Sequence, residues 1–246
     1  MKVTICGAQG VGKTTLVDSL SEKWQKYVIK KVIRNIVLHS TQEVKVNEEA
    51  DAYGQTLFFA KYLQILNSKD NYITDRGLVD VAAYTKYLVY KRKLGSGIYQ
   101  NQIRSIQERL SKNPDEVFVY IPIEFELEDD GFRSMDKIYQ DEIDRSFREV
   151  FEDLGVEPIV ICGAPDKRLK DLETILTKLE KKKKVESPNK LKPYKKLDIM
   201  PAKTIIKSEN DEDAAIKKAL STIKFESFTG KEFEIAVEEA TKMFEA

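Results

Sequence analysis

The chain has 246 residues, of which 41% are hydrophobic and 33% charged, a balance typical of a globular protein with a buried core. Lysine plus arginine and aspartate plus glutamate number 41 each, so the net charge indicates no polyanionic partner. No apolar run approaches the length of a membrane span, and no secretory leader pattern opens the sequence, so a cytoplasmic location without membrane contact is expected.

Short apolar runs alternate with amphipathic stretches through the first 180 residues. This alternation predicts an α/β fold in which a parallel sheet is covered by helices on both faces, a three-layer α/β/α arrangement. Five runs are expected to form the strands of this sheet: Val3–Cys6, Tyr27–Ile33, Tyr72–Thr74, Val117–Ile121 and Pro158–Cys162.

Two of the intervening segments carry clear helix signals. The segment 48–67 follows Asn47, a plausible N-cap, and has acidic residues in its first turn. The segment 138–154 has apolar residues at helical spacing, and Gly155 supplies a stop. Both segments are therefore predicted to be helices that pack on the sheet.

The two cysteines, Cys6 and Cys162, each end a strand-like run. A buried free thiol is the ordinary expectation at such a position. Two cysteines alone make no metal site, and their scarcity fits a reducing compartment.

The composition changes near residue 180. A lysine-rich stretch with two prolines follows, so residues 181–209 are expected to be a linker or surface strap, and 210–246 a helical extension. Three interpretations of this tail stay open. The helices pack on the first domain or on a second copy in a homodimer; the Lys181–Lys196 region contacts nucleic acid; or the tail docks elsewhere.

The stretch GAQGVGKT, residues 7–14, follows the first strand and precedes a helix-compatible segment. It fits the G-x-x-x-x-G-K-[ST] phosphate-binding loop in the strand–loop–helix context that the motif requires. Glycines allow backbone N–H groups to converge on phosphate oxygens, Lys13 supplies a point charge, and the Thr14 hydroxyl suits a Mg²⁺ shell. The sequence therefore predicts a nucleoside triphosphate site, with ATP and Mg²⁺ as ligands.

The second motif, Asp75-Arg76, ends the third predicted strand. In a parallel sheet the carboxyl ends of the strands face the ligand crevice. There Asp75 could bind Mg²⁺ or accept a proton, and Arg76 could hold a phosphate. A surface salt bridge is the alternative interpretation of this pair.

In this order the motifs resemble those of the P-loop nucleoside and nucleotide kinase superfamily, which includes thymidylate kinases and deoxynucleoside kinases. The resemblance is strongest to the AAA-type ATPase and kinase family that contains the nicotinamide riboside kinase part of bacterial NAD regulators, and it suggests a phage-type deoxynucleoside monophosphate kinase. It spans about residues 1–170 and rests on GAQGVGKTTL, VIRNIV, DAYGQTLFFAKYLQ, TDRGLVDVAAYT, DDGFRSMD and ICGAP.

The resemblance implies a role for each matched residue. The donor nucleotide would be held by Gly7, Gly10, Gly12, Lys13, Thr14 and Thr15, with Thr14 and Asp75 near the metal. The acceptor would be held by Arg34, Gln55 and Asp80, with Tyr84 in support. The catalytic set would be Lys13, Asp75, Arg76 and Arg133, the last in a lid over about 126–154.

One position departs from the family. Its members often have an acid three residues before the arginine that matches Arg34, and this chain has Lys31. Asp75 would then be the base, or the acceptor needs little base help, because phosphoryl transfer depends mainly on positioning and charge neutralisation. In the lid, Arg145 and Arg148 are either charge-neutralising groups or partners of nearby acids on the helix surface.

The leading hypothesis is an ATP-dependent kinase acting on a deoxynucleoside monophosphate or a nucleoside. A base could stack on aromatic residues of the segment 48–67, although core packing is the alternative for each of them. Two other hypotheses stay open: a kinase acting on a base or an end within nucleic acid, and a nucleotide-dependent ATPase or switch.

Overall fold

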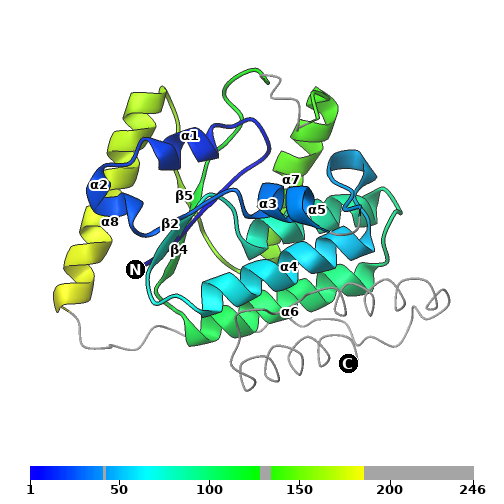
Figure 1. The fold of residues 1–246 in the computed structure, drawn as a ribbon, viewed down its shortest axis with the longest axis horizontal. Coiled ribbons are helices and arrows are strands. Elements are labelled where there is room, and N and C mark those ends of the chain that lie inside the picture. Colours follow the sequence, from blue (N-terminus) through cyan, green and yellow to red (C-terminus); the bar gives the residue numbers. More distant parts are fainter. Residues whose placement is uncertain (41–42, 128–133, 186–246) are drawn as a thin grey trace.

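A computed structural model of the protein describes residues 1–40, 43–127 and 134–185 (Figure 1). The predicted tail from 186 onward and the predicted lid residue Arg133 lie outside the described residues. The final described helix, α8, runs from Pro165 through Val185, past the predicted start of the linker at 181. The homodimer and the nucleic-acid contact, which were inferred from the tail, therefore stay predictions. Within the described ranges, no helix is both long enough and apolar enough to cross a bilayer.

The predicted five-stranded parallel sheet is confirmed. Its strands are β1 Lys2–Cys6, β2 Val28–Ile29, β3 Tyr72–Thr74, β4 Glu116–Tyr120 and β5 Ile159–Val160. They lie in the order β2-β3-β1-β4-β5, with every neighbouring pair parallel. The strand β1 occupies the centre, because its residue Val3 pairs with Ile73 on one side and with Val117 on the other.

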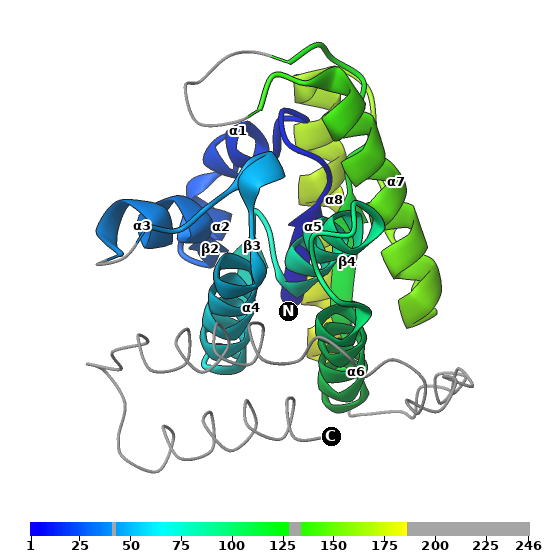
Figure 2. The ribbon, with the colours of Figure 1, turned by 90° about the vertical axis from the view of Figure 1, so that its right-hand side faces the viewer.

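Helices cover both faces of the sheet, as predicted (Figures 1 and 2). On one face α1 packs against α8, with α2 beside them, and on the other face α4, α5, α6 and α7 pack against one another. The remaining helix α3 lies before α4 in the chain. The helices are α1 Lys13–Asp18, α2 Glu22–Gln25, α3 Val32–His39, α4 Ala52–Asn67, α5 Leu78–Tyr90, α6 Ser96–Lys112 and α7 Lys137–Leu154.

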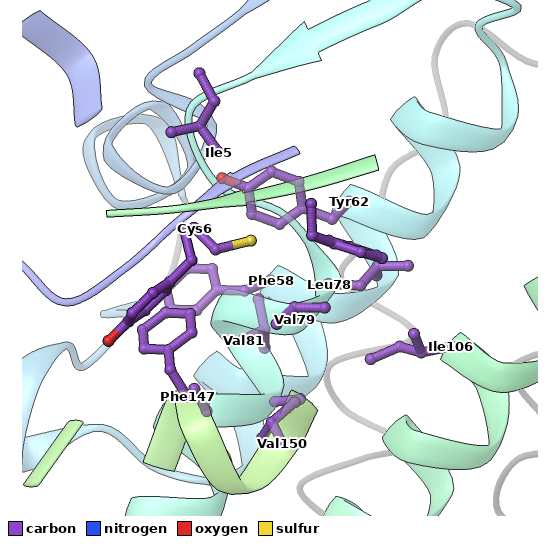
Figure 3. Close-up of a cluster of buried hydrophobic side chains, with 14 of the residues drawn as sticks. Ile5, Cys6, Phe58, Tyr62, Leu78, Val79, Val81, Ile106, Phe147 and Val150 are labelled. Atoms are coloured by element: carbon purple, nitrogen blue, oxygen red, sulfur yellow. The ribbon is translucent and has the colours of Figure 1, made fainter. Parts of the chain in front are cut away.

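The main core lies between the sheet and the second helical layer. Figure 3 shows side chains from β1, α4, α5, α6 and α7 meeting there. The central strand is buried on both faces, so its apolar run is continuous rather than alternating. The labelled members of the cluster are Ile5, Cys6, Phe58, Tyr62, Leu78, Val79, Val81, Ile106, Phe147 and Val150.

Two predicted element boundaries are wrong by four residues, and those of the other described elements differ by two residues at most. The strand predicted over Tyr27–Ile33 ends at Ile29, because Lys31 adopts a left-handed conformation (φ 59°) and α3 begins directly after it. The helix predicted from residue 48 begins at Ala52, where the Asp51 carboxylate accepts a hydrogen bond from the Gly54 N–H at 2.9 Å. Residues Asn47–Glu49 form a separate 3₁₀ turn before it.

The helix predicted over 138–154 is confirmed as α7. Its Asp136 cap accepts hydrogen bonds from the N–H groups of Ile138 and Tyr139. Gly155 ends it in the left-handed conformation (φ 65°), as expected for a glycine stop. The burial predicted for the two thiols holds for Cys6 but is wrong for Cys162, because Cys162 follows the exposed edge strand β5.

Candidate active site

The sheet order places the two predicted motifs side by side. From β1 the chain steps over β3 to reach β2, whereas from β3 it steps over β1 to reach β4. The connection after β1 runs toward one edge of the sheet and the connection after β3 runs toward the other edge. A crevice therefore opens between them, outside the carboxyl ends of β1 and β3. The phosphate-binding loop follows β1, and Asp75 directly follows β3. Topology alone therefore brings both motifs to one crevice.

A cleft of about 930 Å³ occupies this position. Its walls come from the loop after β1, the start of α3, one side of α4, the end of β3 with α5, and the segments before α7 and at the start of α8. Most of the predicted site residues line it: Gly10, Gly12, Lys13, Thr14, Thr15, Arg34, Gln55, Asp75, Arg76, Asp80 and Tyr84. The structure thus brings the predicted donor and acceptor residues into one continuous space.

The loop has the backbone that its glycines allow. Gly7, Gly10 and Gly12 all have positive φ. Gly7 lies behind the cleft rather than in its lining, and a Cβ atom there would fall 2.5 Å from the Ile121 carbonyl oxygen. The Lys13 ammonium donates to the carbonyl oxygens of Gly7 and Ala8, so it lies folded along the loop.

Burial of Lys13 and the nearby Arg76 charge lower the pKa of its amino group to about 7. A buried cation without a polyanion is poorly stabilised, and a phosphate bound in the loop would favour its charged form. The loop therefore has the electrostatics of an anion site.

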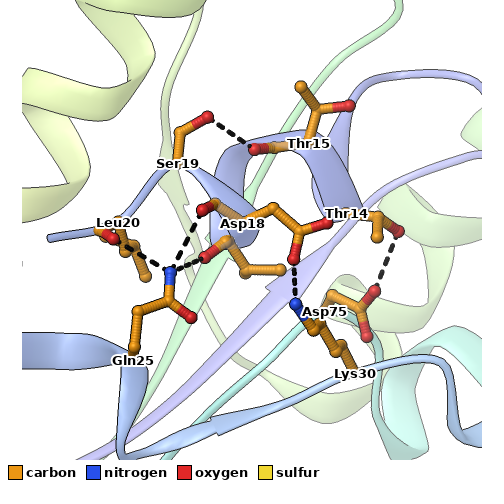
Figure 4. Close-up of polar contacts among 9 residues, drawn as sticks. Thr14, Thr15, Asp18, Ser19, Leu20, Gln25, Lys30 and Asp75 are labelled. Atoms are coloured by element: carbon orange, nitrogen blue, oxygen red, sulfur yellow. Dashed lines mark hydrogen bonds and ion pairs between the residues drawn. The ribbon is translucent and has the colours of Figure 1, made fainter. Parts of the chain in front are cut away.

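Asp75 connects the two motifs directly. The Thr14 hydroxyl donates to Asp75 Oδ2 at 2.8 Å (Figure 4). Asp75 is 3% exposed, and its Oδ1 has no hydrogen-bond partner within the described part of the chain. A hydroxyl oxygen beside a buried carboxylate oxygen is a ligand set that suits Mg²⁺. The described residues contain no cluster of three or more His, Cys, Asp or Glu side chains suited to a metal, so phosphate oxygens and water would complete the shell.

Arg76 and Asp80 extend this arrangement along α5. Arg76 Nη1 donates to the Tyr84 hydroxyl at 3.5 Å, and that hydroxyl donates to Gln9 Oε1 at 2.9 Å. Asp80 Oδ2 accepts from the Gly77 N–H at 3.0 Å, which caps the first turn of α5. Burial raises the pKa of Asp80 to about 6. These contacts tie Arg76 to the phosphate loop and place Asp80 beside it.

The acceptor side of the cleft is formed by α3 and α4. Arg34 lines it from α3, and Gln55 lines it from α4, where Gln55 Oε1 accepts from the Thr85 hydroxyl at 3.3 Å. Among the aromatic residues of α4, Phe58 and Tyr62 also line the cleft. The Tyr62 hydroxyl is buried without a partner in the described ranges, and burial raises its pKa well above the usual value. This wall combines an apolar surface with unsatisfied polar groups, as ligand pockets commonly do.

Arg168 is among the cleft residues that were not predicted from the sequence. Arg168, 4% exposed in the first turn of α8, donates to the Val11 carbonyl at 2.7 Å and to Glu124 at 2.5 Å. Its guanidinium also lies 4.8 Å from the centre of the Phe125 ring. Arg168 therefore fixes the back of the phosphate loop to the segment after β4. The sequence carries no local signal for this contact, because the partners are 157 and 44 residues away.

The predicted lid arginines are only partly described. Arg148 pairs with Asp144 at 2.6 Å along α7 and is exposed, which confirms the surface-pairing interpretation for this residue. Arg145 is exposed on the same helix and does not line the cleft. Arg133, the residue assigned to catalysis, lies outside the described residues, so its role stays a prediction.

The family model described as "AAA domain" matches residues 2–168. The chain belongs to this AAA-domain family. The match covers both motifs and all five strands, in agreement with the resemblance drawn from the motif order. A search of curated proteins found no match to this AAA-domain protein.

Solved structures with a similar fold include deoxyadenosine kinase from M. mycoides, in a structure with products dCMP and dCDP. It is 16% identical, with a TM-score of 0.48, over 74% of this chain and 99% of that one. Another is the YorR protein from Bacillus subtilis in complex with phosphorylated GDP. It is 19% identical, with a TM-score of 0.47, over 74% of this chain and 98% of that one.

Proposed function

We propose that this AAA-domain protein is an ATP-dependent kinase that transfers the γ-phosphoryl group to a deoxynucleoside monophosphate or a nucleoside. The observation that carries the proposal is the contact between Thr14 and Asp75 inside a cleft that continues to Arg34 and Gln55. Hydrolysis of ATP requires only a phosphate site and water. A second, partly apolar wall beyond Asp75 supplies the room in which a molecule other than water would be the acceptor.

The donor would lie on the phosphate loop. The N–H groups of the loop and the start of α1 would surround the phosphates, and Lys13 would exchange the carbonyls of Gly7 and Ala8 for phosphate oxygens. Mg²⁺, held near Thr14 and Asp75, would supply charge neutralisation for the phosphates. Arg168 and Gln140 hold the loop from behind, through the carbonyls of Val11 and Gln9. The loop is therefore positioned before any ligand arrives.

The acceptor would lie between Arg34, Gln55 and Arg76. Its oxygen attacks the γ-phosphorus, the bond from that phosphorus to the β–γ bridging oxygen breaks, and ADP leaves with the electron pair. For a hydroxyl acceptor, the proton passes to Asp75 or to solvent. A monophosphate acceptor is already ionised and needs no base, which fits the presence of Lys31 where the family often has an acid. Lys13 and Arg76 balance the charge that develops on the moving group.

A screen with γ-labelled ATP tests the proposal. The acceptors are the nucleosides, the deoxynucleoside monophosphates, and DNA, with Mg²⁺ present and with Mg²⁺ removed by chelation. We expect label in a nucleotide product only with Mg²⁺. Label in DNA would support the nucleic-acid hypothesis instead, and release of phosphate that no acceptor accelerates would support the ATPase or switch hypothesis.

Asp75→Asn provides the matching test within the protein. The amide retains the shape of the carboxylate but removes the anionic oxygen from the proposed metal site. We expect turnover to fall about 100-fold, with a higher Mg²⁺ concentration needed for half-maximal rate. Thr177→Val, which removes a hydroxyl that bonds only to the backbone of α8, is the control and should leave both quantities unchanged.

A further inference from the structure

Gln9, the third residue of the phosphate loop, has a buried side-chain NH₂ group that no described residue satisfies. Its side chain is 3% exposed and lines the cleft. Gln9 Nε2 has no hydrogen-bond partner among the residues that the structure describes. Buried polar groups are nearly always paired, so an orphaned donor on a residue that lines a cleft indicates a ligand oxygen.

The contact with Tyr84 sets the orientation of this amide. The Tyr84 hydroxyl accepts a hydrogen bond from Arg76, which can only donate. The hydroxyl proton is directed to Gln9 Oε1 at 2.9 Å. This assignment directs the oxygen of the amide toward α5 and leaves the NH₂ group as the end without a partner.

The backbone of Gln9 is held as firmly as its side chain. Gln140 on α7 donates from Nε2 to the Gln9 carbonyl oxygen at 2.7 Å. Gln9 is thus held from α5 through Tyr84 and from α7 through Gln140. A donor fixed from two sides needs little rearrangement to meet a ligand, which is the condition for effective stabilisation of developing charge.

The surroundings indicate the chemistry of the ligand. Lys13 and Arg76 line the same cleft as Gln9. An N–H donor in a cleft that two cations also line favours an anionic oxygen as its partner. Asp75 and Asp80 also lie in the cleft, yet neither carboxylate is bonded to Gln9 Nε2. The group that satisfies it must therefore come from outside the described residues.

We propose that Gln9 Nε2 donates a hydrogen bond to a phosphate oxygen located between the phosphate loop and Arg76. This inference rests on the proposed kinase function. It adds Gln9 as a substrate-contacting residue and Tyr84 as the residue that orients the Gln9 amide. The phosphate is either the γ-phosphate of ATP or the phosphate of a monophosphate acceptor. In both cases Gln9 connects the donor loop to the Asp75-Arg76 motif.

Nuclear magnetic resonance of the full chain tests the contact without requiring turnover. The side-chain ¹⁵NH₂ signal of Gln9 is assigned by its loss in Gln9→Glu. We expect this signal to shift when Mg²⁺ and a non-hydrolysable ATP analogue bind, if the partner is the γ-phosphate. If the partner is the acceptor phosphate, the shift appears with a deoxynucleoside monophosphate and not with the analogue. Absence of a shift with either ligand, added separately or together, overturns the proposal.

Kinetics supply the second measurement. Gln9→Ala should lower turnover about 100-fold, the usual effect of losing one preorganised donor. Gln102→Ala is the matched control, because Gln102 is 2% exposed on α6 with both amide atoms unpartnered among the described residues, and it does not line the cleft. Its turnover should stay within about two-fold of the parent, and thermal unfolding of both variants checks that they fold.

Tyr84→Phe separates orientation from contact. It leaves the Gln9 amide in place but removes the bond that turns its NH₂ group toward the cleft, so we expect a smaller loss of turnover and a reduced ligand-dependent shift of the Gln9 signal. The proposal fails alone if the parent protein transfers phosphate but Gln9→Ala does so within two-fold of the parent rate. The proposed function fails instead if the parent transfers phosphate to no acceptor, and the analogue titration then still tests the contact with the γ-phosphate.

Discussion

Two clusters of buried charge lie at opposite ends of the same sheet. At the carboxyl ends of β1 and β3, Lys13, Asp75 and Asp80 line a cleft, and both aspartates have a carboxylate oxygen without a hydrogen-bond partner in the described ranges. At the amino ends of β3 and β4, Arg109 and Glu116 form an ion pair at 3.2 Å, with side chains 4% and 3% exposed.

The second cluster is paired mainly within itself, although Arg109 Nε and Glu116 Oε2 have no hydrogen-bond partner in the described ranges. The Arg109 guanidinium also bonds to the Asn67 side chain, to the Leu66 carbonyl and to the Tyr72 hydroxyl, and none of these residues lines the cleft. Equal burial thus accompanies two different roles. The charges of Arg109 and Glu116 pair with each other away from the cleft and hold elements together, whereas the charges of Lys13, Asp75 and Asp80 line the cleft, where a ligand can meet them. Substitutions in the two clusters should therefore change different measurable quantities.

The largest expected effect is that of Lys13→Ala on phosphoryl transfer. Loss of this charge should lower turnover about 1000-fold or more, because no other described cation reaches the loop carbonyls that Lys13 now contacts. Circular dichroism should show an unchanged fold, since a poorly stabilised buried cation has been removed. Parental turnover in this variant would place the phosphate site elsewhere.

Arg109→Ala should lower stability and leave turnover unchanged. It leaves Glu116 buried without its partner, which should lower the free energy of unfolding by about 3–5 kcal/mol. Urea denaturation measures this loss, and turnover per folded molecule should stay at the parental value. A fall in turnover with unchanged stability would contradict the separation of the two clusters.

Proton uptake on nucleotide binding gives a third measurement. With its pKa lowered to about 7, Lys13 is mostly neutral at pH 8, and bound phosphates favour the charged form, so binding of Mg²⁺·ATP analogue should take up close to one proton. Calorimetry at pH 8 in two buffers of different ionisation enthalpy counts this proton. Lys13→Met should abolish the uptake; uptake of the same size in that variant would assign the proton to another group.

Arg148→Ala is expected to have the smallest effect. Arg148 is exposed, but its partner Asp144 is buried and keeps the hydrogen bond from the Tyr120 hydroxyl, so loss of the pair should lower the free energy of unfolding by about 1 kcal/mol and change turnover by less than two-fold. A ten-fold fall in turnover would indicate that Arg148 reaches the substrate in another conformation of α7.

The sequence alone was enough to predict those parts of the site that depend on residues close together in the chain. The glycines of residues 7–14 and the position of Asp75 after a strand could be predicted, because the loop and the strand end are local features that the parallel topology then brings together. Boundaries were less predictable. Asn47 and Asp51 are both plausible helix caps, and packing of Ala52 and the residues after it selects Asp51.

Contacts between distant segments could not be predicted at all. Arg168 and Gln140 hold the phosphate loop through backbone carbonyls, and any residue has a carbonyl, so no motif marks the partner. The amide of Gln9 was visible within the motif, but its orphaned state appears only when Tyr84 from α5 is placed beside it. The exposure of Cys162 likewise depends on β5 being an edge strand.

The hydrogen bond from Arg168 on α8 to the phosphate loop has a practical consequence for designing shorter versions of the protein. The family match ends at Arg168, but the helix that carries this residue packs on the domain through Leu172 and Leu176, which are fully buried further along α8. A fragment cut at the end of the match would keep the guanidinium and lose its anchor. The smallest unit with an intact nucleotide pocket must therefore extend at least to Leu176.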